Sequence, residues 1–335
     1  MNILSLLGGR ILWAGDGDSL QALVSNLLPD QFAAIMAVAN ADRAEHQTRV
    51  ASKAAAREAR KTAVTAAMGA VASAAGARVS FEDDDEDDAD EEKYYYHSAT
   101  YKLEGNTAII GIRGALVNSD AWYLKYLGAV GYPHIVDQAM RAYNDSRVTN
   151  IVLDISSPGG AVSGVNETTQ VLQAVDMEKP IVSYTSNMMC SGGYWLGVSG
   201  RKIISDSLAQ VGSIGVAMTH LEYSKMLEQN GITATVLRKG EYKMLMTPYE
   251  PMSDKARAEA KHDMDVIYDA FTMHVAVGRG VSQDMVKKDM AEGRVFWGQE
   301  ARQVGLVDEI GDISLAVANS QQLADNRPAT ATFGH

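Results

Sequence analysis

Residues 150–160 read NIVLDISSPGG, and this stretch decides the fold. The run over 150–155 is apolar almost throughout, as is typical of a parallel strand buried on both faces. A turn built of serine, proline and glycine follows at once, at Ser156 to Gly160. Glycines at the carboxyl end of a strand let backbone N–H groups point into a cleft, where they can hold a developing oxyanion. Taken alone, the segment is better interpreted as a plain turn.

Strand and helix patterns alternate outward from this segment. The pattern predicts strands over 107–113, 150–155 and 180–185, and helices over 134–144, 165–177, 191–198 and 253–277. Further strands and helices are expected to alternate to about Ile310. Such alternation predicts an α/β fold with a mostly parallel sheet that is covered on both faces.

Composition divides the chain of 335 residues into four parts. Residues 1–81 are predicted to form an alanine-rich helical arm, 82–96 an acidic disordered linker, 97–317 the α/β domain and 318–335 a flexible tail. The linker holds ten acidic residues, and all other residues of the chain together carry a net charge of only −2, compared with −12 for the whole chain. Nucleic-acid binding is therefore not indicated. No stretch is long and apolar enough to be read as a membrane anchor, so a cytoplasmic protein is expected.

Two further segments carry residues with catalytic chemistry. In MMCSGGY, residues 188–194, Ser191 stands between a strand and a helix, with two glycines behind it. A helix N-terminus favours negative charge beside such a hydroxyl, although a simple N-cap serine is the ordinary interpretation. In KGEYK, residues 239–243, the lysines would by themselves be taken as solvated surface residues.

Together these segments resemble the SppA-like serine peptidases, the family of signal peptide peptidases and phage procapsid proteases. The resemblance covers residues 107–316 and is carried by SPGG at 157–160, SGGY at 191–194, VGSIGV at 211–216 and GRVFWGQEARQVGLVDEIG at 293–311. It implies a ClpP/crotonase-like fold of repeated β-β-α units. Among its members, the phage head-maturation proteases are the most similar in organisation, because a helical arm and an acidic linker precede the protease domain here.

The resemblance also implies the site residues. Ser191 would be the nucleophile, Lys243, 52 residues later, its general base, and Ser213 the group that orients the lysine amine. The oxyanion hole is implied at the backbone amides of Gly160, Gly159 and Gly192. A serine hydroxyl needs a base, and a lysine can be that base only while its amine is neutral, a form that burial favours. The reaction would pass through an acyl-enzyme, with no cofactor and no metal. The expected partners are peptide or protein substrates, scaffold and capsid proteins among them, and further copies of the chain.

Several alternatives stay open on the sequence alone. His220, 29 residues after Ser191, could serve as the base of a Clp-like serine–histidine–aspartate peptidase. A bacterial cytoplasmic peptidase that degrades signal peptides would carry the same dyad. A crotonase-like acyl-CoA enzyme would use the oxyanion hole without a nucleophilic serine, and a non-catalytic assembly scaffold would use neither. Cys190, the single cysteine, is interpreted as a packing residue; it excludes an internal disulfide and a cysteine-built zinc site.

Overall fold

The structure, a computed structural model, describes residues 101–121 and 124–326, together with five single residues between 37 and 55. Those five are helical and exposed, and Thr48 Oγ1 donates to the carbonyl oxygen of Ala44 at 2.9 Å. The rest of the predicted helical arm, the whole acidic linker and residues 327–335 lie outside the described residues.

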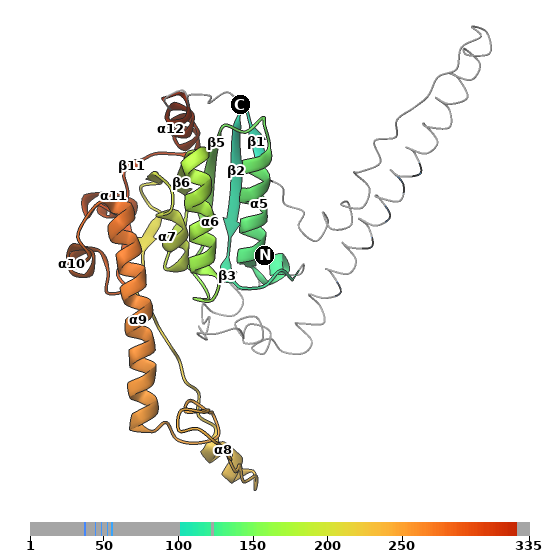
Figure 1. Ribbon diagram of the computed structural model, residues 1–335, viewed down its shortest axis with the longest axis vertical. Coiled ribbons are helices and arrows are strands. Elements are labelled where there is room, and N and C mark those ends of the chain that lie inside the picture. Colours follow the sequence, from blue (N-terminus) through green and yellow to red (C-terminus); the bar gives the residue numbers. More distant parts are fainter. Residues whose placement is uncertain are drawn as a thin grey trace, which may run out of the picture.

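A six-stranded sheet forms the centre of the described domain (Figure 1). Its strands are, in spatial order, β1 (Lys102–Glu104), β2 (Thr107–Arg113), β5 (Asn150–Ser156), β6 (Ile181–Thr185), β8 (Lys202–Ser205) and β11 (Glu309–Ile310). All neighbours pair in parallel except β1, which is antiparallel to β2. The predicted α/β class with a mostly parallel sheet is thus confirmed.

Strand β5 shows why the central apolar run folds as it does. Ile151, Leu153 and Ile155 are fully buried in the larger core, on the face covered by four helices. Val152, between them in the chain, is buried in the smaller core on the opposite face. Because side chains alternate across a strand, a run with apolar residues at both alternating sets of positions is stable only where both faces are covered. The predicted strands at 107–113 and 180–185 are confirmed with similar bounds.

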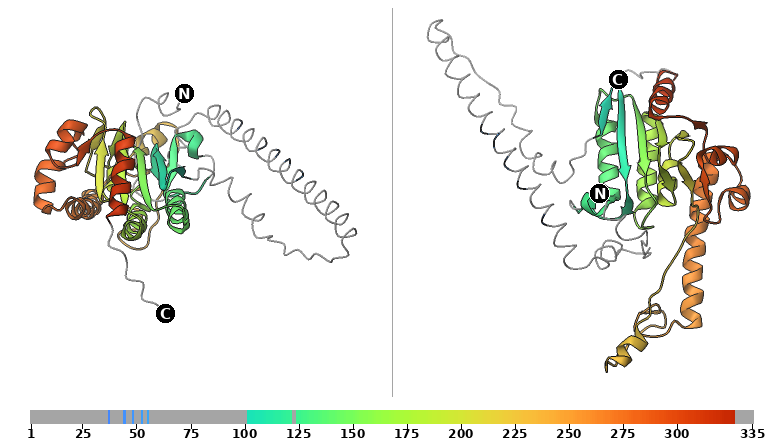
Figure 2. Two further views of the ribbon diagram at one scale, coloured as in Figure 1. Left: turned by 90° about the horizontal axis from the view of Figure 1, so that it is seen from above. Right: turned by 180° about the vertical axis from the view of Figure 1, so that it is seen from behind.

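Helices cover the two faces unequally. Four helices pack on the larger core: α5 (Tyr132–Asn144), α6 (Val165–Glu178), α7 (Gly192–Gly197) and α9 (Asp254–Arg279). The opposite face carries α12 (Ile313–Asp325). Figure 1 views the sheet from the side of α5 and α6, and the right-hand view of Figure 2 from the other side. The remaining short helices are η1 (Leu124–Leu127), α8 (Ser224–Gln229), α10 (Gln283–Met285), η2 (Val286–Met290) and α11 (Gly298–Gln303).

Two small sheets lie at the carboxyl end of β5. One pairs β3 (Ala115–Val117) with β4 (Ala129–Gly131), and the other is ordered β10 (Val295–Trp297), β9 (Gln210–Gly212), β7 (Met188–Cys190). Single parallel bridges join Leu116 to Gly160 and Ser157 to Met189. The turn after β5 therefore runs between the two small sheets and is held by both.

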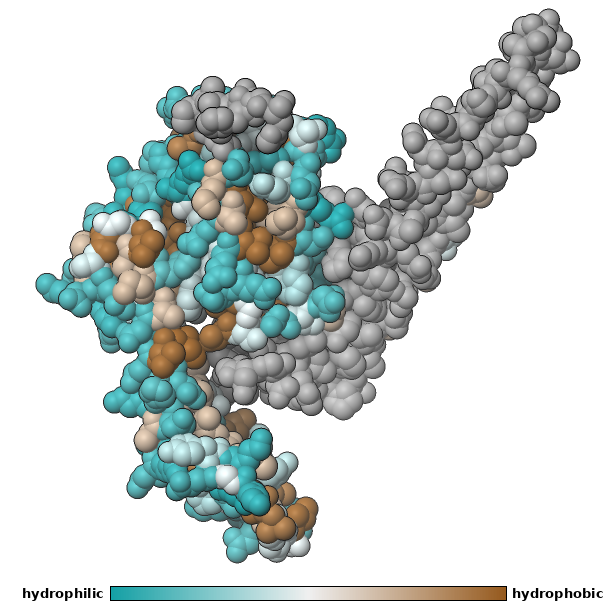
Figure 3. All heavy atoms as spheres, in the orientation of Figure 1, coloured by the Kyte–Doolittle hydropathy of each residue, from teal (hydrophilic) through white to brown (hydrophobic). Residues whose placement is uncertain are grey.

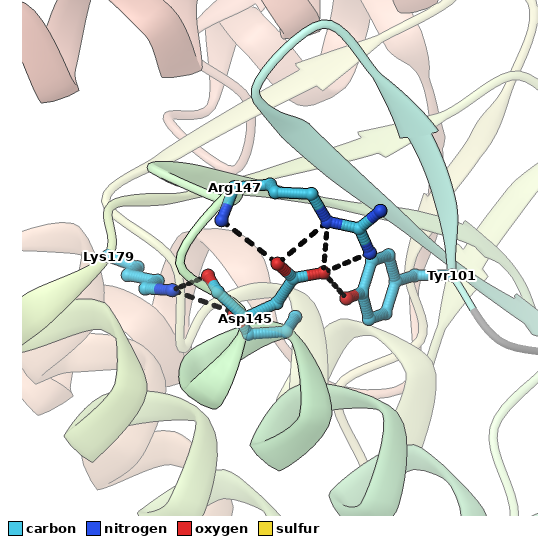
Figure 4. A network of polar contacts seen from close by, with 5 residues as sticks. Tyr101, Asp145, Arg147 and Lys179 are labelled. Carbon is cyan, nitrogen blue, oxygen red and sulfur yellow. Dashed lines mark hydrogen bonds and ion pairs between the residues drawn. The ribbon is translucent and has the colours of Figure 1, made fainter. Parts of the chain in front are cut away.

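Polar contacts fix the connection that leads from α5 into β5 (Figure 4). Asp145 accepts hydrogen bonds from Tyr101 Oη at 2.6 Å and from Arg147 Nη2 at 2.7 Å. The bonds from Arg147 and then Tyr101 hold the pKa of Asp145 well below its usual range. Lys179 Nζ donates to the carbonyl oxygens of Ala142 and Asp145 at 2.9 and 2.7 Å, which satisfies acceptors at the end of α5.

The chain end differs from the prediction. A flexible tail was expected from residue 318, but α12 continues to Asp325. Asp312 caps the helix by accepting from the Leu315 N–H at 3.0 Å, and Ser320 Oγ donates to Asn150 Oδ1 at 3.0 Å. The Ser320 bond ties the polar second half of the helix to the first residue of β5, so the predicted boundary at 318 is wrong.

Residues 217–253 form a second departure, named here the projecting loop. They contain no strand, only the short helix α8, whereas continued strand–helix alternation was expected. The loop extends away from the sheet and returns through α9 (Figure 1). The Tyr223 N–H donates to the Pro248 carbonyl oxygen at 2.7 Å, which joins the outgoing and returning parts of the loop. Its exposed large apolar residues are Leu221, Tyr223, Met226, Ile232, Leu237, Tyr242, Met244 and Tyr249. Apolar side chains are visible at its outer end (Figure 3).

Candidate active site

Ser191 occupies a strained position between β7 and α7. Its backbone has φ 50° and ψ −125°, a conformation that costs free energy for any residue with a side chain. The Ser191 N–H donates to the carbonyl oxygen of Gly212 at 2.8 Å, and its own carbonyl accepts from the Trp195 N–H at 2.9 Å. The surrounding structure thus forces this serine into a sharp strand-to-helix turn, as the MMCSGGY segment predicted.

The glycine turn after β5 lies directly against this serine. A Cβ atom placed on Gly159 would come within 2.5 Å of Ser191 Cβ and 2.8 Å of the Gly192 nitrogen. Gly159 has φ 106°, which also requires glycine. Its N–H donates to Ser157 Oγ at 3.1 Å, so this amide already has an acceptor. Gly159 therefore allows the turn and the serine to approach each other, while its amide serves the turn.

The amides of Gly160 and Gly192 are open. Gly192 is the first residue of α7, where N–H groups have no acceptor inside the helix. Among the described residues, the Gly160 N–H has no backbone acceptor either, and a Cβ on Gly192 would lie 3.3 Å from that nitrogen. Two donors therefore sit side by side next to Ser191 Oγ, the arrangement that stabilises an oxyanion.

Supporting contacts for this turn come from upstream in the chain. Leu116 donates its N–H to the Gly159 carbonyl at 2.9 Å and accepts from the Ala161 N–H at 2.8 Å. Tyr132 Oη donates to the Ala161 carbonyl at 2.7 Å, and burial raises the pKa of this phenol, which keeps it protonated. The sequence did not predict the supporting roles of Leu116, Tyr132 and Ser157. No local motif marks Leu116 or Tyr132. The third stood within SPGG, and its position before two glycines was the available signal.

Ser191 opens into a cleft of about 680 Å³. Gly160, Gly192 and Ser213 line the same cleft. Ser213 follows Gly212, whose carbonyl holds the Ser191 amide, and its φ of 51° is also strained. The structure thus brings Ser191, Ser213 and the amides of Gly160 and Gly192 to one cleft, with Gly159 directly behind Ser191.

Lys243 lies elsewhere. It is exposed on the projecting loop and does not line the cleft. Its neighbours Glu241 and Tyr242 contact Lys255 in the first turn of α9, with a 2.7 Å ion pair and a 4.0 Å contact of the ammonium to the ring centroid. The side chain of Phe271, which stacks on Trp195 beside the serine, is 16 residues further along that helix, or about 24 Å at the α-helical rise. Within one chain, the predicted base and nucleophile are therefore apart.

The other two candidate groups do not join the site either. His220 stands on the projecting loop and does not line the cleft. Cys190 is buried, and its Sγ contacts the carbonyl oxygen of Gln210 at 3.6 Å. Burial raises the pKa of its thiol to about 11, so the thiolate needed for nucleophilic attack is scarce at neutral pH. The packing interpretation of Cys190 agrees with this environment.

Comparison with known proteins fits the geometry. Residues 173–327 match the family model described as peptidase family S49. The chain carries a peptidase S49 domain. This family of serine peptidases is ClpP-like in fold, in agreement with the class expected from the sequence.

Relatives of the S49 domain include phage and cellular proteins. The chain is 29% identical over 235 residues to "Capsid assembly protease C" of Escherichia phage lambda, covering 70% of this chain and 53% of that one. It is 28% identical over 218 residues to "Head-tail preconnector protein GP5" of Enterobacteria phage P21, covering 65% and 43%. A "Putative signal peptide peptidase SppA" of Enterococcus faecium is 28% identical over 203 residues, with 60% and 59% covered. The chain spans about half the length of these curated relatives. No helix of its described part is long and apolar enough to cross a membrane.

Proposed function

We propose that the protein is a serine endopeptidase in which Ser191 attacks a peptide carbonyl and Lys243 is the general base. The observation that carries the proposal is the strained Ser191 held against the open amides of Gly160 and Gly192. The carbonyl oxygen of a bound peptide would accept from these two amides while the serine adds to its carbon. The resulting acyl-enzyme would then be cleared by water.

The lysine would reach the serine of a second copy of the chain. Lys243 stands on a loop that leaves its own domain, and many apolar side chains of this loop are exposed in the single chain. Burying them against a neighbour is favourable. Docking into the neighbour's cleft would also remove water from the amine, as a neutral lysine base requires. Ser213, which lines the cleft beside Ser191, would then accept or donate a hydrogen bond to orient that amine.

Fluorophosphonate labelling tests the nucleophile and the base. Wild type should be labelled at Ser191, whereas Ser191→Ala and Lys243→Ala should each be silent, because the two residues act as one unit. Lys239→Ala, an exposed lysine on the same loop, is the matched control and should label like wild type. Lys261 lines the cleft within one chain. Loss of labelling in Lys261→Ala together with full labelling of Lys243→Ala would assign the base to Lys261 instead.

Mixing the two silent variants tests the second copy. The Lys243→Ala chain keeps Ser191, and the Ser191→Ala chain keeps Lys243, so each supplies what the other lacks. Labelling should return in the mixture and mark only the Lys243→Ala chain. A mixture as silent as its components, at a concentration where wild type labels fully, would place both residues of the dyad in one chain.

We further propose that the substrates are scaffold and capsid proteins cut during phage head assembly, in the host cytoplasm. The names of the lambda and P21 relatives support this role. Incubating the enzyme with the products of neighbouring genes, followed by mass spectrometry of the fragments, tests it. Fragments that appear with wild type and not with Ser191→Ala would identify the substrate. Cleavage confined to unrelated peptides would favour a degradative peptidase.

A further inference from the structure

One part of the cleft lining is apolar and rigid. The indole of Trp195 stacks on the ring of Phe271 with centroids 4.4 Å apart and planes 6° from parallel. Val162, Val165 and Ile267 line the same cleft. An apolar side chain of a bound peptide would remove water from these surfaces, which favours its binding.

The charged groups of the cleft are distributed unequally. Lys261 and Asp265 lie four residues apart on α9, so their opposite charges are neighbours on one helix face. Glu292 enters the cleft from another element, the connection between η2 and β10. Its carboxylate has no ion-pair partner among the described residues. Lys287, whose ammonium lies 5.9 Å from the Tyr268 ring centroid, is itself paired with Asp269 at 2.6 Å.

The backbone holds Glu292 in an unfavourable conformation. Of the described residues other than glycine, four have positive φ, and three of these line the cleft: Ser191, Ser213 and Glu292. Glu292 has φ 62° and precedes Gly293, which has φ 69°. Glycine would adopt this backbone conformation without strain. The presence of glutamate therefore indicates that its side chain has a role, in local contacts or in function, that compensates for the backbone strain.

A hydrogen bond from Tyr268 fixes the Glu292 carboxylate at the cleft. Glu292 Oε1 accepts from Tyr268 Oη at 2.7 Å, across from the connection to α9. Burial, and then the hydrogen bond to Glu292, raise the pKa of Tyr268 to about 12, so the phenol stays a donor at neutral pH. The bond uses one carboxylate oxygen and leaves the negative charge in place, next to the apolar lining.

We propose that Glu292 is a specificity-determining residue that selects peptides with a basic side chain close to an apolar one. The apolar residue would occupy the lining around Trp195 and Phe271, and the basic residue would pair with the Glu292 carboxylate. This proposal rests on the proposed function, because it takes the occupant of the cleft to be a peptide.

Peptide binding to the full-length Ser191→Ala protein tests the proposal without relying on cleavage. A fluorescein-labelled peptide of alanines with one central leucine is compared with a set in which a single arginine is moved through each other position. Fluorescence anisotropy gives each Kd, and glutamine in place of arginine is the neutral reference. At one position arginine should bind about fivefold tighter than glutamine, which is the upper end for a partly exposed ion pair. The preference should weaken as salt is added.

Variants then assign the preference to Glu292. Adding Glu292→Gln should abolish the arginine preference at that position, and Glu292→Lys should turn it into a preference for glutamate. Asp284→Asn, an exposed carboxylate outside the cleft, is the matched control and should keep the preference. Equal binding of arginine and glutamine peptides at every position, or an arginine preference that survives in Glu292→Gln, would overturn the proposal. Because the serine is absent throughout, a failure of catalysis appears only in the labelling experiment and is distinguished from a failure of selectivity.

Discussion

The close approach of Gly159 to Ser191 gives a sharp test of the geometry of the site. Replacing Gly159 by alanine places a methyl group 2.5 Å from Ser191 Cβ and 2.8 Å from the Gly192 nitrogen. Both neighbours are held by the turn and by α7, so neither can move without shifting the Ser191 hydroxyl. The substitution also forces alanine to adopt a φ of 106°.

The magnitude follows from two costs. A residue with a side chain in a sparsely populated backbone region costs about 1–3 kcal/mol, and overpacking a well-filled site costs about 1–3 kcal/mol more. Gly159→Ala should therefore lower the free energy of unfolding by about 2–6 kcal/mol. If the protein relieves the clash by moving Ser191 by about 1 Å, the rate of fluorophosphonate labelling should fall by about 100-fold.

Two other glycines separate these costs. Gly280 ends α9 with φ 65° and open space around it, so Gly280→Ala should show only the backbone cost of about 1–2 kcal/mol and normal labelling. Gly111 has neither a positive φ nor a neighbour within 4 Å, so Gly111→Ala should change stability little. Urea denaturation and labelling kinetics measure all three. A Gly159→Ala protein that is as stable and as rapidly labelled as Gly111→Ala would refute the contact between turn and serine.

Three further outcomes follow from particular contacts. Burial alone would raise the pKa of Asp308, but the hydrogen bonds and charge of Arg279, at 2.6 and 2.9 Å, prevail and lower it. Asp308→Asn should therefore lower the free energy of unfolding at pH 7, measured by urea denaturation, by about 3 kcal/mol. The difference in this free energy between variant and wild type should become smaller as the pH falls below about 4. There the Asp308 carboxylate takes up a proton, first in the unfolded chain and then, at lower pH, in the folded one. Cys190→Ala should be labelled at the wild-type rate, and the native thiol should react slowly with iodoacetamide at pH 7; rapid alkylation would contradict its burial. Ser157→Ala leaves the Gly159 amide without its acceptor and should slow labelling while Ser191 remains present, whereas unchanged kinetics would show that this bond does not hold the turn.

The parts of the fold that sequence predicted well are those in which burial leaves a pattern. Strands β2, β5 and β6 each have apolar residues at consecutive positions because both of their faces are covered. The glycine turn was predictable because the φ of 106° at Gly159 requires glycine, and Ser191 was singled out because it stands between a strand and a helix, before two glycines. In each case the physical requirement acts on neighbouring positions, so a short stretch of sequence records it.

Other features depend on contacts that no short stretch records. The second half of helix α12 is mostly polar or small residues, with Leu323 as its one large apolar residue, and the helix packs on the sheet through Ala316, Val317 and Leu323. Leu116 supports the glycine turn through its backbone N–H and carbonyl groups, and its side-chain type does not indicate this role. The projecting loop has apolar residues that resemble buried strands, yet Leu237 is 88% exposed. Composition could not distinguish apolar residues buried within the chain from those left for a neighbour.

This last distinction bears on how the site becomes active. Ser191, Ser213 and the two open amides line one cleft, so they are in place in a single chain. The predicted base belongs to an element that is not packed on that core. If the lysine must come from a neighbour, the isolated chain holds a formed oxyanion hole beside a serine that lacks its base. Activity per chain would then increase with protein concentration. Fluorophosphonate labelling per chain should likewise rise with concentration until assembly is complete. Labelling per chain that is constant over a wide dilution series, with the protein shown to be monomeric by light scattering, would contradict a base supplied by a second copy.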